Sequence, residues 1–361
     1  MFLRKLLPAL LVAFTGCTDN IVIYCSDPSC GDAGAPSGDD NMMNPGGGGK
    51  PDMSVERDMH RAPDLTYVPP PFGTVGAQGG TVSRLLFGVT GDTRPANGDD
   101  VSGYPTSVIT NIFGAMQTAG AQFAVATGDH QYVISSGYSG SQQQLQLYQQ
   151  AMQALQGKPI FPVMGNHECS ESAFCAVGGY SPGRFQAYMD ILVTPYGYSQ
   201  PYYSFDVKTD NGASIARFIL AADTAWDSNQ SAWLDQTLSA AQSEAKYIFL
   251  FRHYPIGTLT SDANVGPSLQ EEESIINKYH YTLLITGHNH EYSRDPNVPN
   301  VIVMGLGGAP FATAGGDRPP TRFESFWGYL IVEQQGDGTI QVTLYDQANP
   351  GAPMDAVTVA P

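Results

Sequence analysis

The chain has 361 residues, of which 42% are hydrophobic and 11% aromatic, so it is long enough for one large domain or two smaller ones with a buried core. It carries 17 Lys and Arg residues against 34 Asp and Glu residues, a formal net charge of −17. Because nucleic-acid polymers are bound chiefly through Lys and Arg side chains that neutralise phosphates, this balance argues against such a partner.

The N-terminus has the pattern of an export signal. Arg4 and Lys5 precede an apolar run at residues 6–14 that is too short for a typical membrane-spanning helix. Cys17 ends the sequence Phe-Thr-Gly-Cys, which is similar to a bacterial lipobox, whose cysteine is lipidated. We therefore expect residues 1–16 to be a lipoprotein signal peptide and Cys17 to anchor an exported protein to a membrane of the cell envelope. The alternative is an ordinary secretory signal followed by an unrelated cysteine.

Residues 31–71 have the composition of a flexible tether. Fourteen of these 41 residues are Gly or Pro, and Tyr67 is the only aromatic residue among them. Such a segment cannot bury enough apolar surface to offset the entropy of folding. As a coil it spans on the order of 35 Å. We expect residues 17–71 to separate the lipid anchor from one folded domain at residues 72–361.

The four cysteines other than Cys17 form two close pairs, Cys25 with Cys30 and Cys169 with Cys175. An oxidising compartment outside the cytoplasm favours a disulfide within each pair. The alternative is a set of four soft metal ligands, but neither pair has the Cys-x-x-Cys spacing that is typical of such sites.

From residue 72 onward, short apolar runs alternate with helical patterns. The runs end in polar loops that contain Gly, and their length and their β-branched or aromatic residues favour buried strands. In chain order the expected strands are residues 85–89, 123–126, 160–164, 215–220, 247–251, 283–285 and 301–304. Expected helices cover residues 104–118, 141–156 and 228–241, and a hairpin covers residues 328–333 and 339–345. The last helix is expected to begin at Ser228 as its cap. The alternation predicts an α/β domain with helices on the faces of the sheet.

Five of the expected strands end at side chains that can bind a metal ion. In chain order these side chains are Asp92, Asp129, Asn166, His167, His253, His288 and His290. Open α/β sheets usually bind ligands at the carboxyl ends of their strands. Each fragment alone has an ordinary explanation, since Gly-Asp is common in turns and a single histidine after a strand is more often a surface residue. His288 and His290 are stronger as a pair, because residues two apart in an extended segment share one face about 7 Å apart.

Together these motifs resemble the calcineurin-like metallophosphoesterase family. Two Gly-Asp motifs, then Gly-Asn-His-Glu, then Gly-His-x-His occur in that order from Asp92 to His290, which covers most of the expected domain. The resemblance implies a single four-layer α/β/β/α sandwich. It also implies metal-dependent hydrolysis of a phosphorylated small molecule or ester, most often a monoester, at a dinuclear site.

Two positions make the purple acid phosphatases the most similar branch. Many family members have Asp-x-His in the first motif, but Arg94 stands at that histidine position, and its protonated guanidinium cannot bind a metal. Purple acid phosphatases also lack that histidine and supply a tyrosine from Gly-Asp-x-x-Tyr, a pattern that ends here at Tyr132. The tail Gly-His-x-His-x-Tyr-x-Arg at residues 287–294 is also similar. That branch normally has Gly at the position of Arg94, so Arg94 is a candidate for binding the substrate phosphate. A packed aromatic is the alternative reading of Tyr132.

The resemblance also implies a ligand set. The first metal ion would be bound by Asp92, Tyr132 and His290, and the second by Asn166, His253 and His288, with Asp129 bridging both. Carboxylate and phenolate oxygens suit Fe(III), whereas imidazole and amide oxygen suit Zn, Mn or Fe(II). A metal-bound hydroxide would be the nucleophile of an in-line displacement. His167 would stabilise the developing charge or protonate the leaving group, and a bridge from Cys169 to Cys175 would hold the loop just beyond it.

Three functions follow from these observations. The leading one is a hydrolase of phosphate monoesters, with a phosphodiesterase or a nucleotidase as close variants. The second is a non-catalytic surface lipoprotein that binds a metal or a ligand on the same scaffold, and the near-complete ligand set argues against it. The third is an adhesion or interaction protein that acts through residues 31–71, which leaves the folded domain without a role.

Overall fold

The fold is seen in a computed structural model, in which residues 72–169, 182–256, 267–311 and 321–361 are described. Contacts divide the chain into Met1–Leu65 and Thr66–Pro361, and all described residues lie in the second unit. No helix of this described part is long and apolar enough to cross a membrane. The predictions for the N-terminal 71 residues and for Cys175 lie outside the described residues, so the signal peptide, the tether and both disulfides stay predictions.

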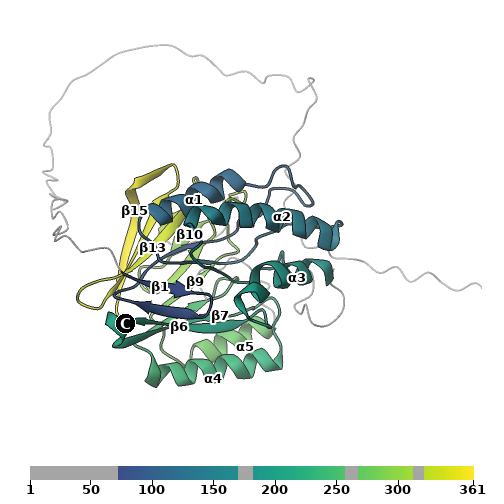
Figure 1. Ribbon diagram of the computed structural model, residues 1–361. Coiled ribbons are helices and arrows are strands. Elements are labelled where there is room, and N and C mark those ends of the chain that lie inside the picture. Colours follow the sequence, from purple (N-terminus) through teal and green to yellow (C-terminus); the bar gives the residue numbers. More distant parts are fainter. Residues whose placement is uncertain (1–71, 170–181, 257–266, 312–320) are drawn as a thin grey trace, which may run out of the picture. The chain divides into compact units, whose positions relative to one another are not determined.

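Two β-sheets form the centre of the described domain (Figure 1). Across the smaller sheet the strands are β15 (Asn349–Val359), β14 (Ile340–Asp346), β13 (Gly328–Gln334), β3 (Leu86–Thr90), β4 (Ala124–Ala126) and β5 (Ile160–Pro162). Across the larger sheet they are β1 (Gly73–Gly76), β2 (Gly79–Val82), β6 (Tyr203–Thr209), β7 (Ser214–Leu220), β8 (Tyr247–Phe251), β9 (Leu283–Thr286), β11 (Val301–Met304), β10 (Tyr292–Arg294) and β12 (Thr321–Phe323). The strands β3, β4 and β5 run parallel, as do β7, β8, β9 and β11.

Phenylalanine side chains from both sheets fill the space between them. Phe123 on β4 and Phe218 on β7 have ring centroids 5.2 Å apart in an edge-to-face arrangement. Phe87 on β3 stacks on Phe123 at 5.1 Å and meets Phe218 at 5.2 Å. Each such pair stabilises the fold by about 0.5–1.5 kcal/mol beyond its buried area. The main core therefore lies between the sheets and fixes one against the other.

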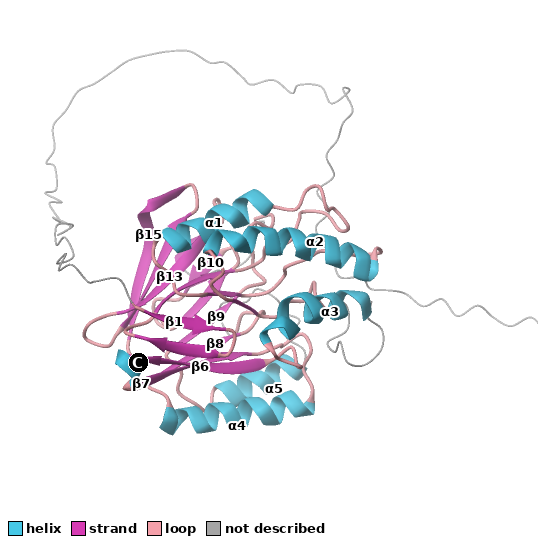
Figure 2. Cartoon of the chain, in the orientation of Figure 1, coloured by secondary structure: helices cyan, strands magenta, loops and turns pink. Residues whose placement is uncertain are grey.

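Helices cover the outer faces of both sheets (Figure 2). On the side of the smaller sheet, α1 (Thr106–Thr118) packs on β3 and β13, α2 (Gly137–Met152) packs on α1, and α3 (Pro182–Tyr188) packs on α2. On the outer face of the larger sheet, α4 (Ser228–Glu244) and α5 (Pro267–Ile276) pack together. Leu234 and Leu238 of α4 join Ile248 and Leu250 of β8 in a second buried cluster. The four-layer α/β/β/α arrangement predicted from the family resemblance is confirmed.

The sequence patterns located most of the central elements but misplaced one helix cap. The seven expected strands all occur, with ends that differ by at most two residues, and the hairpin of β13 and β14 is present. Ser228 is not the cap of α4, so that prediction was wrong. The cap is Asp227, whose Oδ1 accepts a hydrogen bond of 2.8 Å from the backbone nitrogen of Gln230. The carboxylate of Asp also suits the positive end of the helix dipole.

Candidate metal centre

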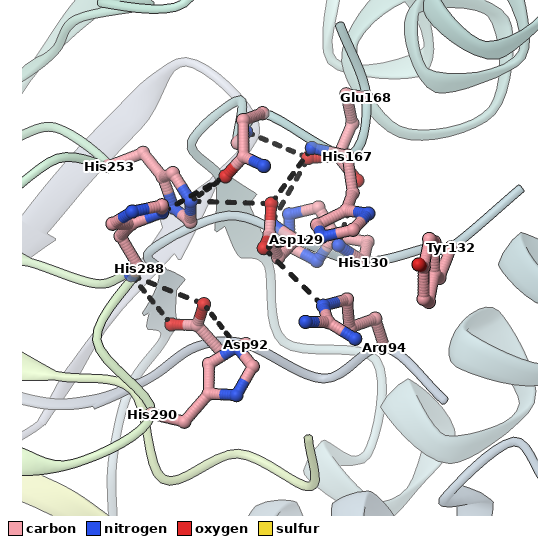
Figure 3. A network of polar contacts seen from close by, with 12 residues as sticks. Asp92, Arg94, Asp129, His130, Tyr132, His167, Glu168, His253, His288 and His290 are labelled. Carbon is pink, nitrogen blue, oxygen red and sulfur yellow. Dashed lines mark hydrogen bonds and ion pairs between the residues drawn. The ribbon is translucent and has the colours of Figure 1, made fainter. Parts of the chain in front are cut away.

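The strand ends of the two sheets deliver the predicted residues to one place (Figure 3). Asp92, Asp129 and Asn166 follow β3, β4 and β5 of the smaller sheet. In the larger sheet, His253 follows β8, and His288 and His290 follow β9. Asp92, Asp129 and His253 each offer a ligand atom, and these atoms lie within 4.8 Å of one another. The six residues therefore come equally from both sheets, at the edge where their parallel strands end.

One group of ligand atoms surrounds the side-chain oxygen of Asn166. His253 Nε2 lies 2.9 Å from Asn166 Oδ1, and His288 Nδ1 lies 3.1 Å from the same atom. Asp129 Oδ1 is 3.3 Å from His253 Nε2. Two imidazoles, an amide oxygen and a carboxylate thus converge, which is the set predicted for the second metal position.

The protonation of His253 shows that this group fits a cation. His253 Nδ1 lies 2.8 Å from the carbonyl oxygen of Thr127, which can only accept a hydrogen bond, so Nδ1 carries the proton. Burial lowers the pKa of His253 below its ordinary value, so the ring is neutral near pH 7. Its Nε2 then presents a lone pair toward the oxygens of Asn166 and Asp129. Electron pairs that face one another in a buried site are what a metal ion satisfies.

A second group lies around Asp92. His290 Nδ1 is 2.5 Å from the carbonyl oxygen of Pro310, which leaves Nε2 unprotonated at 3.6 Å from Asp92 Oδ1. Burial, reinforced by the nearby Arg94, lowers the pKa of His290 to about 3. The backbone nitrogen of His288 also donates to Asp92, at 3.1 Å from Oδ2. Asp92 and His290 are therefore placed together as the prediction for the first metal position requires.

The two carboxylates titrate in opposite directions. Burial and the neighbouring charge of Asp129 raise the pKa of Asp92 well above its usual value. Burial alone would raise the pKa of Asp129 as well, but His253, His167 and Arg94 lower it below its usual range. A cation bound between the two carboxylates would offset both the burial and the like-charge repulsion that raise the pKa of Asp92. The donor set therefore fits the two metal ions that the sequence predicted.

Glycines bring the ligand loops close together. A Cβ atom on Gly165 would lie 2.2 Å from Asp129 Oδ1, and one on Gly287 would lie 2.6 Å from Asp92 Oδ2. Asp92, Asp129 and His288 have φ angles of 58°, 54° and 69°, in the left-handed region that costs a non-glycine residue on the order of 1–3 kcal/mol. The Gly-Asp, Gly-Asn and Gly-His pairs thus reflect crowding at the centre as well as turn geometry.

Glu168 connects two of these loops, a role that the sequence analysis did not assign. Its buried carboxylate accepts hydrogen bonds from the backbone nitrogens of Asp129 at 3.0 Å, His130 at 2.7 Å and Gly165 at 2.7 Å. These donors belong to the loops after β4 and β5. Glu168 therefore sets the distance between Asp129 and Asn166 without being aimed at the centre itself.

The Tyr and Arg of the Gly-His-x-His-x-Tyr-x-Arg motif bind the C-terminal strand. Tyr292 donates a hydrogen bond of 2.7 Å to Asp355 Oδ2. Arg294 contacts both oxygens of Asp355, Nε at 2.6 Å and Nη2 at 2.9 Å. Because Asp355 lies in β15 and the motif lies in β10, this contact joins the two sheets just beyond His290.

His167 and Arg94 lie beside Asp129, and the ring of Tyr132 lies on their far side (Figure 3). The backbone nitrogen of His167 donates to Asp129 Oδ1 at 3.0 Å, and its Nε2 lies 3.7 Å from Oδ2. Arg94 Nε is also 3.7 Å from Oδ2. Arg94 Cζ lies 4.7 Å from the ring centroid of Tyr132. The structure thus brings all nine predicted site residues into one region, and their roles as ligands or catalysts stay predictions.

Cys169 is buried two residues after His167, and its Sγ lies 3.3 Å from the carbonyl oxygen of Thr224. Thr224 in turn donates from its hydroxyl to the carbonyl of Gly165 at 3.2 Å. The segment after His167 is therefore packed against the loop that follows β7. The predicted partner, Cys175, lies outside the described residues.

Comparisons with known proteins agree with this geometry. The family model described as calcineurin-like phosphoesterase matches residues 87–292. No curated protein sequence matches the chain. Among solved structures, the purple acid phosphatase PPD1 from yellow lupin (Lupinus luteus) seeds aligns with a TM-score of 0.56 at 17% identity, over 80% of this chain and 55% of that one. This chain thus spans about half the length of the lupin protein.

Two shorter proteins also align. The Plasmodium protein GAP50, described as the anchor in the inner membrane complex, gives a TM-score of 0.56 at 16% identity, over 77% of this chain and 89% of that one. A dimetal phosphatase from Danio rerio gives a TM-score of 0.51 at 11% identity, over 76% of this chain and 98% of that one. At these identities the alignments show a shared fold.

Proposed function

This chain belongs to the calcineurin-like phosphoesterase family, and from that membership we propose that it hydrolyses phosphate esters, most readily monoesters, at a site for two metal ions. The observation that carries the proposal is the convergence of two buried carboxylates, an amide oxygen and three imidazoles on one edge of the sheets. Because this set of donors is nearly complete, it favours a catalytic hydrolase and argues against a non-catalytic binding protein on the same scaffold.

The proposed ligands follow from the two groups of donor atoms. Asp92 and His290 would bind one ion, Asn166, His253 and His288 the other, and Asp129 both. Two bound ions supply a nucleophilic water at neutral pH and neutralise charge on the phosphate. Fe(III) with Zn, Mn or Fe(II) was the pair expected from the sequence, and that expectation depends on a phenolate ligand from Tyr132.

Arg94 and His167 are the residues proposed to act on the substrate. Both approach Asp129 Oδ2 to 3.7 Å, from which they can reach a phosphate bound at the centre. The Arg94 guanidinium can donate two parallel hydrogen bonds to phosphate oxygens. His167 Nε2 is placed to donate to the phosphate or to the leaving oxygen. A monoester dianion gains more from the positive charge of Arg94 than a diester does, which supports the proposed preference.

Hydrolysis of p-nitrophenyl phosphate by the full chain tests the proposal. The protein is stripped with a chelator and reloaded with manganese, zinc or iron, beside Asp129→Asn and the control Asp346→Asn, whose side chain lies at the end of β14. Metal-dependent turnover that is lost in Asp129→Asn and kept in Asp346→Asn is the expected result. Folded protein without turnover on this substrate or on a diester analogue would instead favour the non-catalytic binding protein.

We further propose that the protein is exported and anchored by a lipid on Cys17. The support is the charged start, the short apolar run and the Phe-Thr-Gly-Cys sequence at residues 14–17. Mass spectrometry of the N-terminal peptide from a membrane fraction tests it, with Cys17→Ser as the control. A lipidated Cys17, and release of Cys17→Ser from the membrane, is expected. An unmodified N-terminus cleaved elsewhere would contradict the anchor.

A further inference from the structure

Arg94 lies between Asp129 and the ring of Tyr132 (Figure 3). Its Nε is 3.7 Å from Asp129 Oδ2, and its Cζ is 4.7 Å from the centroid of the Tyr132 ring. A cation within about 6 Å of a ring centroid is attracted to the π face. The ring also meets the His167 imidazole, with centroids 4.4 Å apart and planes at 72°. Tyr132 is thus packed against the two residues proposed to bind phosphate.

The backbone of Tyr132 is fixed from two sides. Gln144, which is buried on α2, accepts a 2.7 Å hydrogen bond from the backbone nitrogen of Tyr132 and donates a 3.0 Å bond to its carbonyl oxygen. The backbone nitrogen of Asp99 donates to the same carbonyl at 2.9 Å. The ring therefore cannot move toward Asp92 by a shift of its own loop without breaking these bonds.

The position of Arg94 is hard to combine with a metal-binding phenolate. Within the described residues, no hydrogen bond or ion pair joins the Tyr132 hydroxyl to Asp92 or His290, the other predicted ligands of the first position. A permanently charged guanidinium lies on the Asp129 side of the ring instead. Swinging the phenol toward the first position would displace that cation from its place against the ring.

We infer that Tyr132 is a positioning residue that holds the Arg94 guanidinium beside Asp129, and that it is not a metal ligand. The inference rests on the proposed dinuclear site. The first position then offers the carboxylates of Asp92 and Asp129 and the imidazole of His290. Because this set lacks the hard phenolate donor that favours a trivalent ion, both positions suit divalent ions such as Zn, Mn or Fe(II). This replaces the Fe(III) expected from the sequence.

Metal binding separates the two roles of Tyr132 without any need for turnover. The full chain, Tyr132→Phe and the control Tyr345→Phe on β14 are stripped and titrated with Mn²⁺ or Zn²⁺, and His290→Ala shows the effect of losing a ligand. Tyr132→Phe is expected to bind about two ions per chain with the affinity of Tyr345→Phe. Iron-loaded and air-oxidised protein is expected to show no visible charge-transfer band that depends on Tyr132. Loss of one ion, or of such a band, in Tyr132→Phe would overturn the inference.

Phosphate binding tests the contact with Arg94. The variants Tyr132→Leu, Arg94→Ala and the double variant are compared with the full chain for the affinity of inorganic phosphate to the metal-loaded protein. Removing the ring should weaken phosphate binding about two- to fivefold, with unchanged metal content, and the double variant should match Arg94→Ala alone. Independent effects that add in the double variant would contradict the positioning role. Should the protein prove not to be a phosphatase, both binding measurements still decide the role of Tyr132.

Discussion

Asp129 Oδ1 lies 3.3 Å from His253 Nε2, although the two residues follow strands of different sheets, β4 and β8. Both side chains are buried, and the contact lies at the centre of the candidate metal site. The distances within this site therefore depend on the packing between the two sheets. They also depend on the glycines, which let the ligand loops come close together, and on Glu168, which joins two of these loops.

Glu168→Gln is expected to weaken metal binding about 10- to 100-fold, the range usual for residues that orient metal ligands. The amide keeps one acceptor oxygen but presents a donor in place of the other, so at least one of the three bonds from backbone nitrogens is lost and the link between the loops of Asp129 and Asn166 is weakened. Isothermal titration with Zn²⁺ or Mn²⁺ measures this, with the exposed Glu244→Gln as the control. Equal affinities in both variants would exclude the proposed role of Glu168.

Gly165→Ala is expected to abolish metal binding at the second position. The added methyl group would lie 2.2 Å from Asp129 Oδ1 and 2.4 Å from the backbone nitrogen of Asp129, which is held by its hydrogen bond to Glu168. Gly114→Ala in α1 is the matched control, since nothing lies within 4 Å of its Cβ, and it should stabilise the helix by about 1 kcal/mol. Metal content and thermal melting of both variants give the answer, and a Gly165→Ala protein with full metal content would refute the crowding argument.

Asp355→Asn is expected to lower the free energy of unfolding by about 1–2 kcal/mol. The change removes the charge that Arg294 contacts with two nitrogens and that Tyr292 contacts with its hydroxyl. These side chains are partly exposed, so the loss is smaller than for a fully buried pair. Urea denaturation measures it, with Asp346→Asn as the control, and identical midpoints would show that the contact between β10 and β15 contributes no stability.

The buried His130 predicts part of the loss of stability in acid. Burial lowers the pKa of this histidine to about 4, and its Nε2 contacts the carbonyl of Val163 at 3.1 Å. Between about pH 6.5 and pH 4 the unfolded chain therefore binds a proton that the folded one does not, so stability falls as the pH falls through this window. Over the window the loss from this residue is about 3 kcal/mol.

His130→Phe isolates that contribution from the other buried histidines. The difference between the free energies of unfolding of metal-free wild type and variant should shrink as the pH falls from about 6.5 to 4, because the variant has no proton to bind there. Denaturation at several pH values measures it. A difference that stays constant across the window would mean that folding does not lower the pKa of His130.

The sequence predicted the centre of the fold better than its borders. Runs such as residues 247–251 are buried on both faces and apolar throughout, so composition alone identified them as strands. The strand β15 contains two prolines and is mostly exposed, so its place depends on pairing with β14 and not on its own pattern. Asp227 and Ser228 are both good helix caps, and only the fold decides between them.

The candidate site shows the same division. Residues such as Asp92 and His253 could be predicted because each of them follows an apolar run that the sequence identifies as a strand. The partners of Glu168 and of Arg294 could not be found in this way. Asp355 lies 61 residues beyond Arg294 in the chain, and three backbone nitrogens that converge on one carboxylate leave no pattern of residue types. Tyr132 matched a motif, but its surroundings depend on Arg94, 38 residues earlier in the chain.

The even division of the ligand residues between the sheets links the interior of the protein to its chemistry. Three of the residues follow strands of the smaller sheet and three follow strands of the larger one. The separation of the sheets is set by the phenylalanine side chains packed between them, including Phe123 and Phe218. Since one residue along a strand is about 3.3 Å, a slip of that size would part the ligand atoms of one sheet from those of the other. A change in the packing of the core is therefore expected to change the distances between the ligand atoms of the two sheets.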